Sequence, residues 1–338
     1  MRSIKFILID TGSESNKIMM SDVGKLGNGI QRSKTYETGN RFLDTLIRLH
    51  FSYEITKRIN LPGKSIWNKY CVLDKLTSDD NTDYCIIIVN NAIHRLSVKH
   101  LNEMQNKDNI HIFSLLLDPF DRLPKNVQAQ LKSVNWEKVF SFQRSDCEKY
   151  GFEFTDKIYS KVNIDDYSVE SDPKSDVYFV GLAKDRMDMI YEIYRKLTGA
   201  GCICDFTVII GKNELDEYKK KYPGISFKTS RIPYSDVLRR LSASRCILEL
   251  CAKGQDGLTM RFYEAVFYNK LLITNNQTAL TSELYDARYM QVINDCKDID
   301  IKKVRELTPV NYGYDGSYSP IYFTKQVLSG MIENEYNN

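Results

Sequence analysis

Short apolar runs alternate along the whole chain with segments in which apolar residues recur every three or four positions. In the first half the runs are continuous rather than alternating, which is typical of strands buried on both faces of a parallel sheet. The runs predict strands at residues 4–9, 84–89, 110–117 and 138–142. The segments between them predict helices. One of these should begin at Ser145, because Ser145 and Glu148 have the spacing of a capping box.

A polar, acidic and proline-containing stretch at residues 163–175 interrupts this series. A second series of the same kind follows, with a helix from about Asp185 and another capped by Ser235 or Asp236. Its predicted strands are residues 176–181, 205–210, 225–228, 246–250 and 271–274. Two such series predict an α/β fold of two doubly wound, Rossmann-like domains that face each other across a cleft.

The predicted organisation has three parts. Residues 1–165 form a first, acceptor-side domain, and residues 173–318 form a second, nucleotide-binding domain. Residues 319–338 contain a closing helix, for which one option is to pack back on the first domain. A chain of 338 residues is long enough for two such domains, each with its own core.

Charge and cysteine content narrow the function classes. The 47 basic and 44 acidic residues nearly balance, which gives no support for a nucleic-acid partner. The eight cysteines lack metal-ligand spacing, so we interpret them as reduced thiols of a cytoplasmic protein without a metal site. The first ten residues predict a strand rather than a signal peptide, and no apolar run reaches the roughly 20 residues that span a bilayer.

Basic residues gather early in the chain. The cluster consists of Lys25, Arg32, Lys34, Arg41 and Arg48. It suits an anionic membrane surface or a phosphorylated acceptor, and it is equally compatible with a solvated face.

The segment from Gly254 to Glu264 carries the most specific chemistry. It lies between two predicted strands, so its loop should end at a helix N-terminus, which favours an anion. An acid to accept ribose hydroxyls, Arg261 for a diphosphate and a glycine for close approach together indicate a nucleotide-sugar site. The plainer alternative is a solvated helix face that happens to carry Asp256, Arg261 and Glu264.

Other loops that follow strands of the second domain should face the same ligand, because ligands bind outside the carboxyl ends of parallel strands. Glycines and cations in these loops suit a diphosphate, and the turn at residues 230–234 offers backbone groups to a base edge. The predicted donor-binding residues are Gly181, Lys184, Arg186, Gly211, Lys212, Arg231, Ile232, Gly257, Thr259, Arg261 and Glu264.

Three residues are candidates for catalysis: Asp118, His94 and Asp256. Asp118 ends a strongly apolar run, so we expect a partly desolvated carboxylate that acts as general base toward a sugar hydroxyl. An aspartate before a proline is also a routine turn former. His94 is the histidine that falls at a strand's carboxyl end.

One segment resembles a known family. Asp256-Gly-Leu-Thr-Met-Arg261-Phe-Tyr-Glu264 resembles the acidic–seven residues–acidic motif of glycosyltransferases with the GT-B fold. Residues 140–154 and 176–181 resemble bacterial proteins of lipopolysaccharide or capsular polysaccharide synthesis. The similarity covers roughly residues 84–275.

The resemblance implies roles for individual residues. Glu264 would hold the donor's ribose, and Asp256 would lie near the sugar or its phosphates. Arg261 and Lys184 would stabilise the departing diphosphate in place of a metal. The first acid is aspartate where the common motif has glutamate, which leaves retention or inversion at the anomeric carbon open.

The predicted function is therefore a cytoplasmic, metal-independent glycosyltransferase without a cofactor. It would move a sugar from a nucleotide-diphosphate donor, a uridine diphosphate sugar, to a growing surface glycan or lipid-linked glycan. Peripheral contact with the inner membrane surface is an option, and nucleic acid is not an expected partner. One alternative is a non-catalytic module that binds a nucleotide sugar or glycan for a partner enzyme, and another is a sugar epimerase or glycoside phosphorylase.

Overall fold

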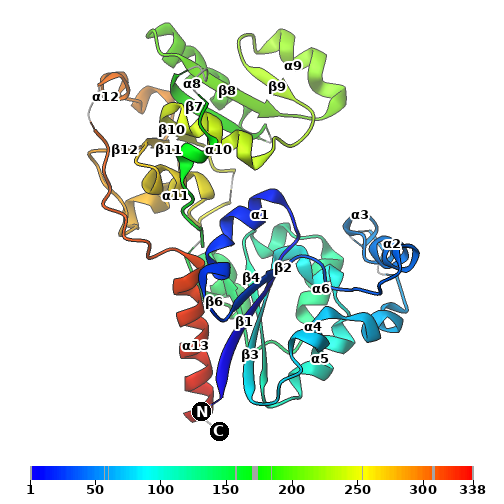
Figure 1. Cartoon of the computed structure of the whole chain (residues 1–338). Helices are drawn as coiled ribbons and strands as arrows, with labels where there is room; N and C mark the ends of the chain where they lie inside the picture. The colour runs from blue at the N-terminus through cyan, green and yellow to red at the C-terminus, as the bar shows by residue number, and fades with distance from the viewer. Residues whose placement is uncertain are drawn as a thin grey trace. The chain divides into compact units, whose positions relative to one another are not determined.

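The computed structural model describes residues 2–56, 58–59, 61–156, 158–169, 174–183, 185–252, 254–306 and 309–336. The chain divides into two compact units. Unit 1 comprises Met1–Ser160 and Tyr318–Asn338, and unit 2 comprises Lys161–Ser317. Each unit contains one six-stranded sheet flanked by helices (Figure 1).

The sheet of unit 1 has the order β2-β1-β3-β4-β5-β6, and its pairings are all parallel. Its strands are β1 (Ser3–Ile9), β2 (Gly29–Arg32), β3 (Thr82–Val89), β4 (Ile110–Leu116), β5 (Lys138–Ser141) and β6 (Glu153–Phe154). The chain moves outward from β1 to β2, then returns to place β3 on the other side of β1. The order therefore reverses between β1 and β3, where a doubly wound sheet leaves a crevice at the carboxyl ends of its strands.

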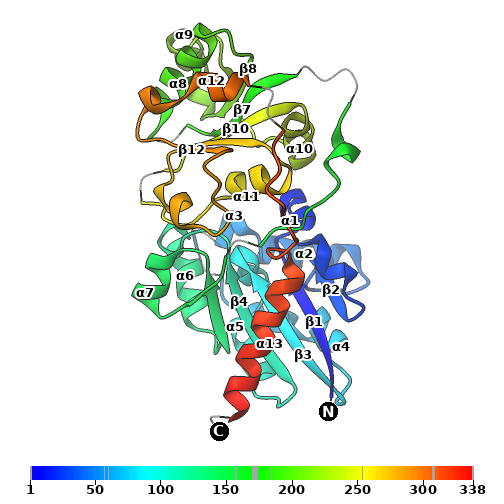
Figure 2. The same ribbon diagram turned by 90° about the vertical axis from the view of Figure 1, so that its left-hand side faces the viewer.

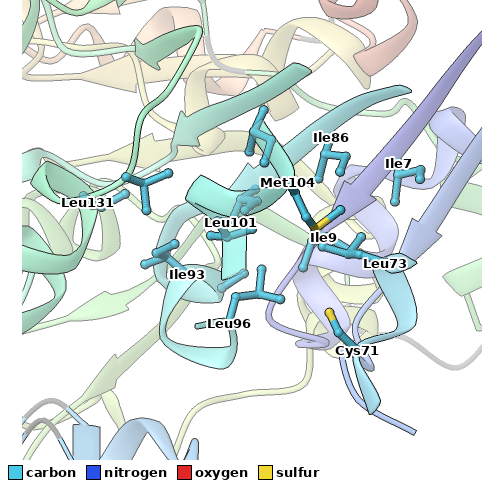
Figure 3. Close-up of a cluster of buried hydrophobic side chains, with 14 of the residues drawn as sticks. Ile7, Ile9, Cys71, Leu73, Ile86, Ile93, Leu96, Leu101, Met104 and Leu131 are labelled. Atoms are coloured by element: carbon cyan, nitrogen blue, oxygen red, sulfur yellow. The ribbon is translucent and has the colours of Figure 1, made fainter. Parts of the chain in front are cut away.

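The core of unit 1 lies between this sheet and its helices. Apolar side chains from β1 and β3 meet Leu101 and Met104 of α5 and Leu131 of α6, as Figure 3 shows. The helices are α1 (Glu14–Met19), α2 (Arg41–His50), α3 (Tyr53–Thr56), α4 (Val72–Leu76), α5 (Val98–Gln105), α6 (Lys125–Lys132), α7 (Arg144–Tyr150) and α13 (Pro320–Tyr336).

The last helix, α13, packs against unit 1, although it follows unit 2 in the chain (Figure 2). The ring of Phe323 meets Phe140 of β5 edge-on, with 5.0 Å between ring centroids. At the start of the helix, Ser319 Oγ donates to Asp22 Oδ2 at 2.7 Å. Buried apolar and polar contacts therefore both attach α13 to the first unit.

The sheet of unit 2 has the order β12-β11-β10-β7-β8-β9, again with parallel pairings. Its strands are β7 (Ser175–Leu182), β8 (Cys204–Ile209), β9 (Ser226–Lys228), β10 (Ser244–Glu249), β11 (Leu271–Thr274) and β12 (Met290–Val292). Its helices are α8 (Met187–Gly199), α9 (Leu215–Lys221), α10 (Tyr234–Ser242), α11 (Met260–Phe267) and α12 (Ile301–Arg305). The strand order reverses between β7 and β10.

The two faces of the unit 2 sheet differ in character. One face is apolar and packs against a stripe of α8 that includes Ile190, Ile193 and Leu197. Successive residues of a strand point to opposite faces of the sheet. On the other face, many of these side chains are polar and lie beneath helices. This face carries Tyr178, Asp205, Thr207, Glu249 and Thr274, which come from four neighbouring strands.

Most of the predicted elements are present, and the errors are local. The long strands appear within one or two residues of their predicted bounds, whereas the short edge strands β2, β6 and β12 were not predicted. The capping box at Ser145 is wrong: α7 begins at Arg144, and its N-cap Gln143 makes no side-chain cap bond. Asp146 instead accepts from Phe120 N at 2.8 Å and Ser141 Oγ at 3.0 Å, so tertiary contacts anchor the first turn.

No helix in the described part of the chain is long and apolar enough to cross a membrane.

The packing of α13 leads to a first prediction. Phe323→Ala should destabilise unit 1 by about 3–5 kcal/mol, because it leaves a cavity beside Phe140. Both tryptophans of the chain, Trp67 and Trp136, lie in unit 1, so denaturant titration followed by tryptophan fluorescence reports on this unit. The neighbouring Tyr322→Ala, at an exposed position, should change stability by about 0.5 kcal/mol or less. An unchanged fluorescence transition in Phe323→Ala would show that α13 does not stabilise unit 1.

Candidate functional site

Arg186 bridges the carboxyl ends of the two strands between which the order of unit 2 reverses. Its Nη2 donates to the carbonyl oxygen of Leu182, at the end of β7, at 3.0 Å. Its Nη1 donates to the carbonyl oxygen of Leu250, just after β10. A Cβ on Gly181 would approach Arg186 Nη2 to 3.3 Å and Phe179 Cζ to 3.1 Å, so glycine makes room for the guanidinium here.

The loop between β10 and α11 starts beside this arginine and is held by the strand next to it. Cys251 N donates to Asn275 Oδ1 at 2.7 Å, and Asn276 Nδ2 donates to the carbonyl oxygen of Gly257 at 3.1 Å. Both asparagines follow β11. The loop that contains Asp256 and Gly257 is therefore fixed at the carboxyl edge of the sheet, where the sequence predicted it to lie.

Glu249 connects the end of this loop to the sheet. It is buried and accepts hydrogen bonds from Thr259 Oγ1 and from Thr274 Oγ1, the latter at 2.5 Å. Thr259 is also the N-cap of α11 and accepts from Arg261 N at 3.1 Å. Burial raises the pKa of Glu249, and the bonds from the two threonines offset part of that effect. One carboxyl group thus positions the amino end of α11.

Asp256 lies in the same loop, two residues before a buried leucine. Its Oδ1 is buried and has no hydrogen-bond partner among the described residues. A buried carboxylate oxygen without a donor is unfavourable, and a bound ligand's hydroxyl groups would supply one. This geometry is compatible with a role in ligand binding or catalysis, and the role itself stays a prediction.

Glu264 makes its hydrogen bonds inside unit 2, and its predicted role with ribose stays a prediction. It is fully buried, and its Oε1 accepts from Tyr234 Oη at 2.6 Å while Oε2 accepts from Arg261 Nη1. Burial opposes the charged form of Arg261, but Glu264, Tyr178 and Tyr234 together outweigh it and raise the pKa of the guanidinium. To bind ribose hydroxyls, Glu264 would have to exchange one of these partners for the nucleotide.

A second arginine completes the polar face of the sheet. Arg240 Nε donates to Asp205 Oδ2 at 2.7 Å, and Arg240 Nη2 donates to Thr207 Oγ1 at 2.7 Å. Arg240 and Arg261 both lie over the ring of Tyr178, with Cζ 5.3 and 6.0 Å from its centroid. The layer beneath α10 and α11 therefore pairs its two arginines with two carboxylates.

The remaining donor-binding candidates lie at other strand ends of unit 2. Gly211 and Lys212 follow β8, where Gly211 N donates to Glu214 Oε2 at 2.7 Å. Arg231 and Ile232 lie in the loop after β9, with Arg231 exposed. Lys184 lies outside the described residues.

In unit 1 the structure contains a cavity of about 540 Å³ where the loops after β2 and β3 approach each other. In the sheet these two strands lie on either side of β1. It is lined by Ser33, Lys34, Thr35, Tyr36, Asp44, Thr45, Ile47, Arg48, Phe51, Ser52, Tyr53, His94 and Arg95. Hydroxyl groups, cations and aromatic rings together suit a sugar that carries an anionic group.

The predicted catalytic residues of unit 1 differ in their surroundings. His94 is buried and packs against the ring of Tyr53 in the cavity wall, with 5.2 Å between centroids. Asp118 is exposed, so the expectation of a partly desolvated carboxylate is wrong. Its Oδ2 accepts from Asn90 Nδ2 at 2.6 Å, while Asp118 N donates to Asn90 Oδ1 at 3.1 Å. This bond pair joins the ends of β3 and β4, which is the structural role of a turn-forming aspartate.

Sequence reasoning missed several residues of these two regions. The apolar pattern places Glu249 inside the predicted strand 246–250 and assigns it no role. A glutamate within such an apolar run indicates a buried polar contact. Arg95 Nη1 donates to the carbonyl oxygen of Ser33 at 2.9 Å, and Thr35 Oγ1 donates to that of Arg95 at 3.0 Å. These bonds hold together two walls of the cavity of unit 1. They join residues about 60 positions apart in the chain, so no local sequence motif predicts them.

Among the described residues, no group of three or more His, Cys, Asp or Glu side chains is arranged to hold a metal ion.

Two solved structures share the arrangement of elements over almost the whole chain. A UDP-N-acetylglucosamine 2-epimerase superimposes with a TM-score of 0.51 at 12% sequence identity, over 95% of this chain and 94% of that chain. An alpha-glucosyltransferase, solved with UDP-glucose and DNA containing an abasic site, gives a TM-score of 0.50 at 11% identity, over 94% and 92%. Comparison with models of known protein families and with curated proteins finds no match. Identities this low establish a shared fold alone, and they confirm the predicted class of two doubly wound α/β units of the GT-B type.

The buried carboxyl of Glu249 leads to a prediction about pH. Its pKa is raised above the ordinary value of 4.5, so the folded state holds the proton more tightly than the unfolded state. The associated stability is complete below about pH 4.5 and is lost as the pH rises toward the folded-state value. Glu249→Gln does not titrate, so its melting temperature should fall less than that of the wild type between pH 4.5 and neutrality.

The matched control is Glu283→Gln, the same change at an exposed position of unit 2, which should retain the wild-type profile. Melting curves followed by circular dichroism give the comparison. Superimposable pH profiles for Glu249→Gln and the wild type would rule out a raised pKa at Glu249.

Proposed function

We propose that this protein is a glycosyltransferase that binds a nucleotide-diphosphate sugar at the carboxyl edge of the unit 2 sheet. The donor is a uridine diphosphate sugar, and the acceptor is a growing bacterial surface glycan or its lipid-linked form. The protein acts in the cytoplasm, in peripheral contact with the inner face of the membrane. Cationic side chains, rather than a metal, face the diphosphate.

The observation that carries this proposal is the loop between β10 and α11. It lies where the strand order reverses and is fixed by Asn275 and Asn276. It presents the buried Oδ1 of Asp256, which has no hydrogen-bond partner in the described part of the chain. It leads into the amino end of α11, whose backbone N–H groups favour an anion. A diphosphate at that end and sugar hydroxyls at Asp256 satisfy both features.

The neighbouring residues divide the remaining tasks. Gly257 and Thr259 bring the backbone close to the phosphates, and Arg186 approaches them from the loop after β7. Lys184, which lies outside the described residues, is proposed as a second cation for the diphosphate. Arg261 and Glu264 form a buried pair that holds α11 in place, with Glu264 turning to ribose only if the nucleotide displaces one of its partners. Gly211, Lys212, Arg231 and Ile232 border the site at the next strand ends.

The acceptor is proposed to bind in the cavity of unit 1. His94 is the better candidate for the general base, because it is a buried imidazole in the cavity wall whereas Asp118 is exposed. An imidazole can take a proton from a sugar hydroxyl near neutral pH. The lining cations Arg48 and Arg95 suit an acceptor with a phosphate or carboxylate group.

The proposal predicts donor binding and turnover that depend on Asp256. Calorimetric titration of the purified protein should show binding of UDP and of UDP-glucose or UDP-N-acetylglucosamine, and the accepted donor should be slowly hydrolysed or transferred. Asp256→Asn should lower kcat/KM for the donor about a hundredfold, because the carboxylate contacts the reacting sugar.

Asp216→Asn, the same change on the exposed surface of unit 2, is the control and should retain full activity. Unaltered turnover in Asp256→Asn would refute the role of this loop. Binding without hydrolysis or transfer would favour the non-catalytic binding module. Interconversion of free nucleotide sugars without an acceptor would favour an epimerase, which the same fold also supports.

A further inference from the structure

The outer face of α2 exposes an apolar stripe that the rest of the described structure leaves uncovered. Phe42, Leu46 and Leu49 are 69%, 38% and 53% exposed. With 3.6 residues per turn, these three positions lie within about 60° of one another around the helix. Ten large apolar side chains are this exposed among the described residues, and half of them come from residues 42–66. Such a concentration marks an interaction surface rather than scattered surface residues.

The stripe belongs to a helix that is firmly attached to unit 1. Asn40 caps α2 by accepting from Phe42 N at 2.9 Å and from Leu43 N at 3.3 Å. On the opposite side of the helix Ile47 is buried, and Phe51 stacks on Tyr36 with 4.8 Å between centroids. Because the inner face is occupied by the core, the outward direction of the stripe is set by the packing.

The segment after α2 exposes two further large apolar side chains. Trp67 Nε1 donates to His50 Nδ1 at 3.0 Å, so residues 64–70 are tied to the carboxyl end of α2. Ile66, in that segment, is 60% exposed, and Ile59 is 62% exposed. In Figure 1, α2 and α3 stand at the side of unit 1 opposite α13.

Charge around the stripe identifies the kind of partner. Residues 32–69 contain eight Lys or Arg against three Asp or Glu, an excess larger than the net charge of +3 of the whole chain. Two of the three acids, Glu37 and Asp44, are each 3.2 Å from Lys34 Nζ. Arg41 and Arg48 are exposed, and both lie along one edge of the apolar stripe. A helix with large apolar residues beside arginines suits the interface of an anionic bilayer.

We infer that the outer face of α2, formed by Arg41, Phe42, Leu46, Arg48 and Leu49, docks unit 1 on the surface of an anionic lipid bilayer. The apolar stripe enters the boundary between headgroups and acyl chains, and the two arginines meet lipid phosphates. This inference rests on the membrane contact in the proposed function and names the surface that makes it.

Docking of α2 on a bilayer would also bring the cavity proposed for the acceptor close to the lipids. Thr45 and Arg48 belong to α2 and line the cavity of unit 1. A docked α2 therefore places that cavity beside the lipid headgroups. An acceptor glycan attached to a lipid through a phosphate would reach the cavity without leaving the bilayer, with Arg48 and Arg95 opposite its phosphate.

The test is sedimentation of the full chain with vesicles of phosphatidylglycerol and phosphatidylcholine in equal parts, compared with pure phosphatidylcholine vesicles. The wild type should bind the anionic vesicles and bind the neutral ones much more weakly. Phe42→Ser/Leu49→Ser should weaken binding about a hundredfold, because it removes two large apolar side chains from the interface. Arg41→Gln/Arg48→Gln should weaken binding to anionic vesicles by about 25-fold and leave the weak binding to neutral vesicles unchanged.

The matched control is Ile203→Ser/Leu280→Ser, the same kind of change at positions of unit 2 that are 64% and 49% exposed. It should bind vesicles like the wild type, and all variants should show wild-type melting curves because the altered side chains are on the surface. Wild-type protein that fails to sediment with anionic vesicles would overturn the inference, as would equal binding by Phe42→Ser/Leu49→Ser. A dimer in sedimentation equilibrium that this same variant dissociates would identify a second copy, rather than a bilayer, as the partner. None of these readouts uses sugar transfer, so a failure here and a failure of the proposed activity are distinguishable.

Discussion

Parallel strand pairing is the constraint on which both units depend. A chain that builds a parallel sheet must cross over after each strand, so all the crossover loops at one edge follow strand ends. When the chain then extends the sheet in the other direction, the two loops that leave neighbouring strands diverge and leave a crevice. In unit 2 this point lies between β7 and β10, and in unit 1 between β1 and β3. The candidate donor loop lies at the point in unit 2, and the cavity of unit 1 lies between the loops that follow β2 and β3, the two neighbours of β1.

Around the crevice of unit 2, buried and half-buried charged side chains hold the neighbouring elements together. Arg186 fills the space between two strand ends by donating to their carbonyl groups, and Glu249 holds the cap of α11. Arg240 and Arg261 are paired with Asp205 and Glu264 below the helices. A buried charge is tolerated only with a partner and with hydrogen bonds, so each of these groups restricts where its neighbours lie. The loop that carries Asp256 is therefore held by hydrogen bonds at both ends, as the proposed donor site requires.

Unit 1 combines its cavity with a surface that is unfavourable in water. The side chains of α2 that face inward complete the core, and those that face outward expose apolar area among arginines. A soluble protein gains nothing from such a face on its own, because apolar area in water is costly. The surface lies next to the cavity proposed for the acceptor, because Arg48 lines that cavity and also belongs to the proposed docking face.

The fold class and the location of the candidate donor loop can both be predicted from the amino-acid sequence alone. Continuous apolar runs identify buried parallel strands, and the loops between runs must lie at sheet edges, so the segment containing Asp256 and Gly257 was found from its position between 246–250 and 271–274. Local pattern also placed His94 at a strand end. The partners of each polar side chain at these strand ends depend on contacts that form only in the folded protein. Burial of Glu264 against Tyr234, exposure of Asp118 and the bond from Thr274 to Glu249 all join residues distant in the chain. The same holds for the outward face of α2, since periodicity identifies an amphipathic helix but does not show which stripe the core leaves exposed. Contacts between distant residues decide solvent access, and solvent access decides whether a charged or apolar group can meet a ligand.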